Sequence, residues 1–132
     1  MAKGIGDVIY SLLSNDTDVT DIVSTRIYPF MAIEDVVYPY LVYTIEDVDP
    51  TVSKCGASPL DTVTFNIEIY TETLSELEDL GNKVRAELDR NKGTIETLNI
   101  QSIAYQNEDY GYADVDRVYL KIQAYSTRIV IY

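Results

Sequence analysis

The chain has 132 residues, the size of one ordinary domain, and this is enough to bury a core without disulfides or metals. Apolar residues make up 46% and charged residues 24%, a balance typical of folded proteins, and no apolar run is long enough to predict a membrane span. The net charge is −12, and no cluster of Lys and Arg predicts a grip on nucleic-acid phosphates.

The first two segments predict helices that pack through one side. In residues 5–13 the apolar positions recur with the helical period: Ile5, Val8, Ile9, Leu12 and Leu13. Asn15 and Asp16 end this helix. Residues 16–24 predict a second, short helix with Asp16 or Thr17 at its N-cap and with Val19, Ile22 and Val23 pointing inward.

The next segment predicts extended chain that leads into a sheet. Residues 26–28 are a brief extended piece, and Pro29 and Pro39 push the tyrosines before them, Tyr28 and Tyr38, out of the helical region. Residues 40–47, beginning with Tyr40, predict a strand with apolar or aromatic residues on both faces. Residues 49–59 are rich in Pro, Gly and Ser and predict a loop. Residues 62–70 alternate cleanly and predict a strand that pairs with the first as an antiparallel hairpin.

The main helix is predicted to begin at Thr73, where Thr73 and Glu76 form a capping box. The helix should end at residues 91–93. Its buried stripe comprises Leu74, Leu77, Leu80, Val84 and Leu88. Gly81 lies inside the helix at a cost of about 1 kcal/mol relative to alanine, so we expect either close packing on the sheet or a kink there.

Two further strands are predicted, at residues 100–105 and 118–125, with an acidic, tyrosine-bearing loop between them. In the second strand Val118, Leu120, Ile122 and Ala124 alternate with Tyr119, Lys121, Gln123 and Tyr125. The order is α-α-β-β-α-β-β. We therefore expect one α+β domain over residues 1–132, with a mainly antiparallel sheet of about four strands and helices mainly on one face.

The residues that usually carry chemistry are nearly missing. The sequence has no histidine, and its only cysteine, Cys55, lies in the predicted loop beside Lys54. An EF-hand loop from Asp47 would need glycine at 52 and glutamate at 58, but Val52 and Ser58 stand there. We expect no metal, no cofactor and no enzymatic activity.

Tyrosine is the most biased residue type, with twelve tyrosines against two phenylalanines. A tyrosine has a large apolar body and a polar tip, which suits protein contacts that are wet before assembly. Strand tyrosines such as Tyr43 and Tyr70 are equally explained by packing within a sheet. For Tyr110 and Tyr112, in the predicted loop, we expect a contact role.

The opening stretch carries a resemblance to a known family. "LLSNDTDVTDIVSTRIYPFMA" followed by "YPYLVYTIED" resembles the start of the tail completion proteins of long-tailed bacteriophages, also called tail terminators or tail-to-head joining proteins. Arg26 to Pro29 matches the family's Arg-Ile-Tyr-Pro element, and Pro39 with Tyr40 matches the Pro-Tyr pair that opens the next strand. "VTFNIEIYT", the helix after Thr73 and "RVYLKIQAYS" are also similar, so the resemblance covers nearly the whole chain.

The resemblance implies a structural virion protein, made in the cytoplasm of the bacterial host, that forms a ring, commonly of six copies. The ring would sit at the head-proximal end of the tail tube, end the tail, contact the tube protein and dock on the head connector. Genome DNA would pass through the lumen without specific binding, and the acidic surplus would then keep phosphates from sticking. A head-tail adaptor, a tube subunit, and a small ligand-binding domain or enzyme remain alternatives.

Two segments are the candidates for contacts between subunits. The first is the predicted loop 49–59, which includes Asp49, Lys54 and Cys55 and which we expect to become ordered against a neighbour. The second is the β-prone end "TRIVIY", with Arg128 and Tyr132, which is either an exposed edge for strand addition or an ordinary internal strand end.

Overall fold

A computed structural model describes residues 4–32, 34, 36–53, 56–95, 98–113 and 117–130. The elements follow one another in the order α1 (Ile5–Ser14), α2 (Thr17–Val23), β1 (Ile27–Pro29), β2 (Tyr40–Ser53), β3 (Gly56–Thr71), α3 (Leu74–Leu88), β4 (Gly93–Ile95), β5 (Leu98–Ile100), β6 (Ala104–Ala113) and β7 (Val118–Val130).

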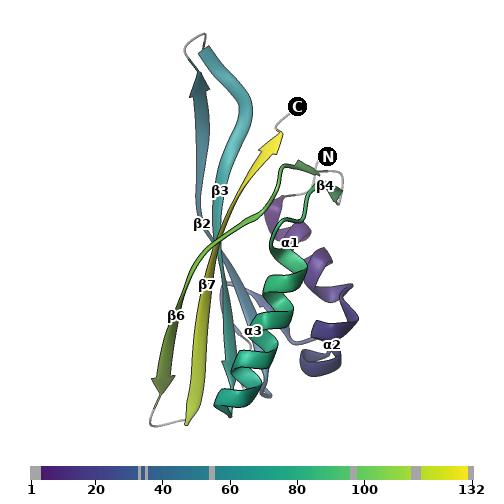
Figure 1. Cartoon of the computed structure of the whole chain (residues 1–132), viewed down its shortest axis with the longest axis vertical. Helices are drawn as coiled ribbons and strands as arrows, with labels where there is room; N and C mark the ends of the chain where they lie inside the picture. Colours follow the sequence, from purple (N-terminus) through teal and green to yellow (C-terminus); the bar gives the residue numbers. More distant parts are fainter. Residues whose placement is uncertain are drawn as a thin grey trace.

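The strands form one sheet, and the three helices lie on one of its faces (Figure 1). Within the described residues the sheet has seven strands, and β1, β2, β3 and β7 lie side by side in that order. On its other side β7 pairs with both β6 and β5, and β5 pairs with β4. β1 runs parallel to β2, and all the other pairs are antiparallel. The expected α+β class is confirmed, but the number of about four strands is too low. β1, β4 and β5 have three residues each, which is too short to show a period in the sequence.

The helices form where the sequence predicts them. The Asp16 side chain caps α2 by accepting a hydrogen bond from the backbone N–H of Asp18 at 3.2 Å. The Thr73 hydroxyl oxygen caps α3 by accepting from the N–H of Glu76 at 3.2 Å. α3 ends at Leu88, a few residues earlier than expected. Together the helices pack their apolar stripes against Leu41, Val63, Phe65, Ile67, Ile69 and their neighbours on the sheet. The expected burial of Leu74 is wrong: it lies in the first turn of α3 and is exposed.

The prediction of a loop at residues 49–59 is wrong. β2 continues to Ser53 and β3 begins at Gly56, so the two strands form a long hairpin that rises beyond the rest of the sheet (Figure 1). The register shifts between Ile45 and Asp47 and again between Pro50 and Val52. Cross-strand pairing there overrides the local preference of Pro, Gly and Ser for turns. We call the part of this hairpin that lies beyond the pair Val48–Val63, residues 49–53 of β2 and 56–62 of β3, the arm.

The C-terminal strands also differ from expectation. The segment predicted as one strand at 100–105 is divided between β5 and β6, with buried Ile103 between them. β6 continues to Ala113, so the acidic segment predicted as a loop is mostly strand. β7 reaches Val130 and pairs with β3 on one side and with β6 and β5 on the other. Residues 127–130 of "TRIVIY" therefore belong to an internal strand, while Tyr132 lies outside the described residues.

Candidate protein-contact surfaces

Arg26 joins the second helix to the start of the sheet. Its Nε donates to the backbone oxygen of Pro39 at 2.9 Å, and its Nη2 donates to the backbone oxygen of Ile22 at 3.2 Å. Its own backbone oxygen accepts from the N–H of Leu41 at 3.0 Å. One partly buried guanidinium thus fixes α2, β1 and the entry into β2 relative to one another, and Pro29 ends β1.

Four tyrosines pack together on the sheet face that carries no helix. The rings of Tyr40 and Tyr70 are stacked with their centroids 4.7 Å apart. Tyr28 and Tyr38 contact Tyr40 at 6.1 and 5.3 Å, and Tyr40 is only 7% exposed. The Tyr70 hydroxyl donates to Glu68 at 2.7 Å, and burial followed by this carboxylate raises the pKa of Tyr70. These tyrosines pack against each other within the protomer.

A buried lysine holds α3 to the sheet. Lys121 of β7 is 2% exposed, and its Nζ lies 3.1 Å from Glu78 of α3 and 3.4 Å from Glu108 of β6. The ammonium also lies 4.7 Å from the centre of the Tyr110 ring. Burial alone would lower the pKa of Lys121, but Tyr110, Glu78 and Glu108 outweigh it and raise the pKa.

Gly81 gives the lysine its room. A Cβ added at Gly81 would lie 3.0 Å from both Cδ and Nζ of Lys121 and 3.4 Å from Nε2 of Gln123. α3 is continuous through this position, so the glycine permits a close approach of helix and sheet.

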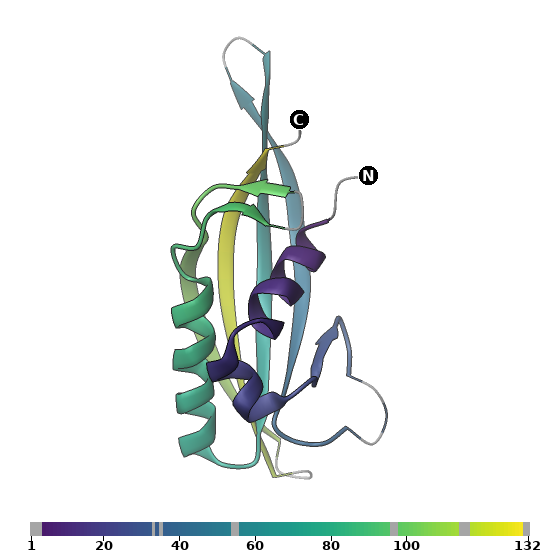
Figure 2. The ribbon, with the colours of Figure 1, turned by 90° about the vertical axis from the view of Figure 1, so that its right-hand side faces the viewer.

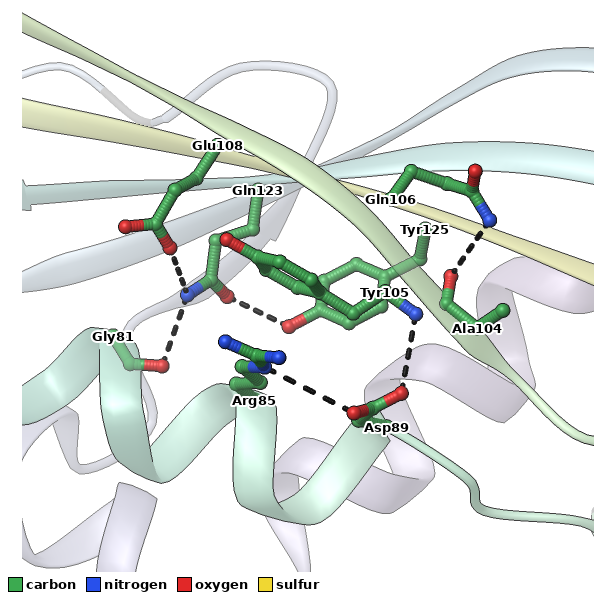
Figure 3. Close-up of polar contacts among 9 residues, drawn as sticks. All are labelled: Gly81, Arg85, Asp89, Ala104, Tyr105, Gln106, Glu108, Gln123 and Tyr125. Carbon is green, nitrogen blue, oxygen red and sulfur yellow. Dashed lines mark hydrogen bonds and ion pairs between the residues drawn. The ribbon is translucent and has the colours of Figure 1, made fainter.

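Polar contacts continue along the side of α3 that faces the sheet (Figure 3). Gln123 donates to the backbone oxygen of Gly81 at 3.0 Å, and the hydroxyl of fully buried Tyr125 donates to Gln123 at 2.7 Å. Arg85 lies over the ring of Tyr105 at 3.8 Å. Burial, and then the carboxylate of Glu108, raise the pKa of Tyr105 to about 12.

The Arg85 guanidinium also lies 3.9 Å from Asp89, which accepts from the backbone N–H of Tyr105 at 3.1 Å. Together with the Lys121 pairs, these contacts attach α3 to both β6 and β7.

The sequence alone did not reveal this polar layer. Lys121, Gln123 and Tyr125 face the helices, whereas Ile122 and Ala124 lie half-buried on the opposite face. The apolar alternation of β7 would have assigned the faces the other way round. The one available signal was Gly81, because a glycine inside a helix implies that something approaches it closely.

Tyr110 and Tyr112 lie in β6 rather than in a loop, but both are exposed, at 55% and 51%. The ring of Tyr112 packs on Tyr119 of β7 at 4.8 Å, and the Tyr110 hydroxyl donates to Glu108 at 3.0 Å. Both therefore present one ring surface to the protomer and another to solvent.

The remaining contact candidates are Asp49, Lys54, Cys55 and Arg128. Asp49 lies in β2 at the base of the arm, paired with Thr62 of β3. Lys54 and Cys55 lie outside the described residues. Arg128 is exposed and lines an open hollow of about 320 Å³ together with Thr62, Gln101, Ser102, Ala104, Ser126 and Thr127. Asp49 and Arg128 therefore lie in one row across the sheet, on either side of Thr62, whereas Tyr110 lies in another row, paired with Lys121.

The described residues show little that could hold a ligand. Among the described residues that line the hollow, Arg128 is the only ionisable one. In the part of the chain that the structure describes, no three His, Cys, Asp or Glu side chains gather as metal ligands would. No helix among those residues is long and apolar enough to cross a membrane.

These features define a small α+β protein with helices on one face of a curled sheet. Two of the solved structures that share this fold illustrate the likeness. One is a chain from the virion of a native gene transfer agent particle, with a TM-score of 0.78 and 15% identity, covering 92% of this chain and 91% of that one. The other carries only a serial label as its name and matches with a TM-score of 0.65 and 12% identity, over 97% of this chain and 94% of that one. At these identities the likeness concerns the fold.

The family comparison goes further. The model of the family described as "Tail completion protein gp17" matches residues 7–129. No curated protein matches the chain. The chain belongs to this tail completion family, as the resemblance implied, and it is a structural protein of the virion tail.

Proposed function

We propose that the chain assembles with copies of itself into a ring at the head-proximal end of the tail tube, where it ends the tail and joins it to the head connector. The observation that carries this proposal is a sheet that is open at both sides. In the described part of the chain, β2 has no strand beside it beyond Tyr43 on one side, and β6 pairs only with β7 on the other. A protomer with two different free edges binds the next copy head to tail. Such contacts form a closed ring when the rotations from one copy to the next add up to a full turn.

The arm supports contacts beyond one protomer. It projects past the helices (Figure 1), and Val48 just below it is 48% exposed although its partner Val63 is fully buried. We infer that a neighbouring subunit or the tail tube protein covers this region. Six copies per ring is the number that the family resemblance implies.

We further propose that the protein acts by shape, without a catalytic step. The charged groups between α3 and the sheet support this, because they form ion pairs with one another. Lys121 is buried between Glu78 and Glu108, and none of the three lines the hollow at Arg128.

The acidity has a role in the same proposal. With a net charge of −12, a ring whose lumen carries acidic side chains repels phosphates and lets genome DNA pass without binding. A basic lumen in an assembled ring would end this part of the proposal.

Removal of the gene from the phage or particle-producing strain tests the whole proposal. We expect tails of abnormal length and DNA-filled heads without tails by negative-stain microscopy, and rescue by the wild-type gene supplied in trans. Normal attached tails would refute the role in joining. If the purified protein instead polymerises into long cylinders, it is a tube subunit.

A further inference from the structure

The two sides of the protomer differ in the helices that cover them. α3 contacts β3, β7 and β6, whereas α1 contacts β1 and β2. In Figure 2, which looks onto the helical face, α3 (green) lies at the left and the segment that follows β1 lies at the right. The two sides therefore offer a neighbouring copy different surfaces.

The side that carries α3 and β6 has free basic groups. Asp89 is already engaged by Arg85 at 3.9 Å. The next two basic residues, Arg90 and Lys92, are exposed, and neither has a carboxylate within 4.0 Å among the described residues. Arg90 is held in place, because its backbone N–H donates to the oxygen of Ile103 at 2.7 Å.

Below these basic groups the same side is apolar. Leu74 at the start of α3 is 51% exposed, and Tyr110 and Tyr112 of β6 are exposed by 55% and 51%. We name these five residues, Leu74, Arg90, Lys92, Tyr110 and Tyr112, the basic edge.

The opposite side has free acidic groups. Glu46 and Asp47 lie at the bulge of β2, both exposed, and neither has a Lys or Arg within 4.0 Å in the part of the chain that the structure describes. Within the described residues Glu46 accepts from neutral donors, from Asn66 at 2.9 Å and from Thr44 at 3.4 Å.

Beside them lies a second apolar group. Phe30, Met31 and Val37 are exposed by 60%, 77% and 61%. Phe30 has a φ of 63°, a region that a phenylalanine rarely adopts, and its N–H is bound to the oxygen of Tyr43 at 2.9 Å. A strained backbone that holds an apolar ring in solvent indicates that the ring contacts another molecule. We name Phe30, Met31, Val37, Glu46 and Asp47 the acidic edge.

The charged parts of the two edges lie at the same height along the strands. Tyr105, whose N–H binds Asp89 at the end of α3, pairs with Tyr125. Tyr125 pairs with Phe65, and Phe65 pairs with Ile45, the residue before Glu46 and Asp47. One row across the sheet therefore joins the basic group at one side to the acidic group at the other.

The apolar parts also share a height, nearer the end of the sheet where β2 begins. Tyr110 pairs with Lys121, Lys121 with Ile69, and Ile69 with Leu41. Phe30, whose N–H binds the oxygen of Tyr43, lies about two residues from this row on the side of the charged row. Val37 comes three residues before Tyr40, whose row through Tyr70 and Leu120 ends at Gly111, between Tyr110 and Tyr112.

We propose that the basic edge of each copy binds the acidic edge of the next copy around the ring, with the aromatic residues against Phe30, Met31 and Val37 and with Arg90 and Lys92 against Glu46 and Asp47. This inference rests on the proposed ring and specifies its contact. For a ring whose axis runs along the strands, groups at equal heights meet. A second copy is the occupant because the charges are complementary, and because most of a surface with net charge −12 repels another copy.

Reciprocal charge reversal tests the pairing. One variant carries Glu46→Lys with Asp47→Lys, and the other carries Arg90→Glu with Lys92→Glu. Each variant alone should associate at least about 10-fold more weakly than the wild type, by native mass spectrometry and light scattering at low salt. A 1:1 mixture should regain the wild-type assembly, because an alternating ring matches every contact. Asp18→Lys with Asp21→Lys, on α2, is the control for the change in net charge, and it should assemble normally.

The results separate this inference from the proposed function. If the wild type forms rings and both reversed variants form them equally well, or if the mixture is not restored, the pairing is refuted while the ring stands. If the wild type stays monomeric at low salt, the pairing is also refuted, and the effect of removing the gene on particles still decides the role in the tail.

Discussion

The substitution Gly81→Ala brings two opposing effects into the same site. Alanine should gain about 1 kcal/mol over glycine inside a helix. Its methyl group would lie 3.0 Å from Cδ and Nζ of Lys121, which is buried and held by Glu78 and Glu108. Crowding of this kind costs about 1–3 kcal/mol. We expect a net loss of about 1 kcal/mol in the free energy of unfolding, or about 4 °C in Tm for a chain of this size.

Urea unfolding followed by circular dichroism, at a concentration where the chain is monomeric, measures this loss. Asn82→Ala is the matched control, because Asn82 is the exposed next residue of α3, and it should stabilise the protein by about 0.5 kcal/mol. In a Lys121→Ala background the crowding is gone, so Gly81→Ala should become stabilising by up to about 1 kcal/mol. Equal stabilisation by Gly81→Ala in both backgrounds would refute the account of a close approach.

Two further predictions concern the arm and the response to alkali. Replacing residues 50–61 with an Asn-Gly turn keeps the pair Asp49–Thr62 and should leave the fold intact but give heads without tails, so complete DNA-filled particles would show that the arm is dispensable. Burial raises the pKa of the Tyr125 and Tyr105 hydroxyls, the latter to about 12. The neutral hydroxyls therefore contribute fully to the free energy of unfolding below about pH 10, and this contribution is lost as the pH rises towards their pKa in the folded state. Tyr125→Phe should therefore reduce the loss of stability between about pH 10 and 11.5 in urea unfolding, and an unchanged slope in Tyr125→Phe would contradict this.

The local elements were largely determined by the sequence. The 3.6-residue period and the caps at Asp16 and Thr73 placed the three helices, because a helix satisfies its backbone hydrogen bonds within the segment itself. The alternation of residues 62–70 located the central part of β3 for a similar reason, since one face is buried and the other is wet. The family was also recognisable from the sequence, through Arg26 to Pro29 and the strand that follows Pro39.

Strand ends and small strands needed the tertiary structure. Pro50 and Gly56 favour turns, yet both lie in strands, because residues far apart in the chain pair across the hairpin. The short strands β4 and β5 exist only through their partners.

Only the tertiary structure decided which groups meet. Lys121 is a charged residue that the sequence would place in water, yet it is buried, because Glu78 from α3 and Glu108 from β6 reach its ammonium from remote parts of the chain. In the same way, the alignment of Arg90 with Glu46 across the sheet follows from strand register, which no local pattern records. Sequence specifies the period of each element, whereas the pairing of elements determines faces, edges and heights, because these depend on contacts between residues that are distant in sequence.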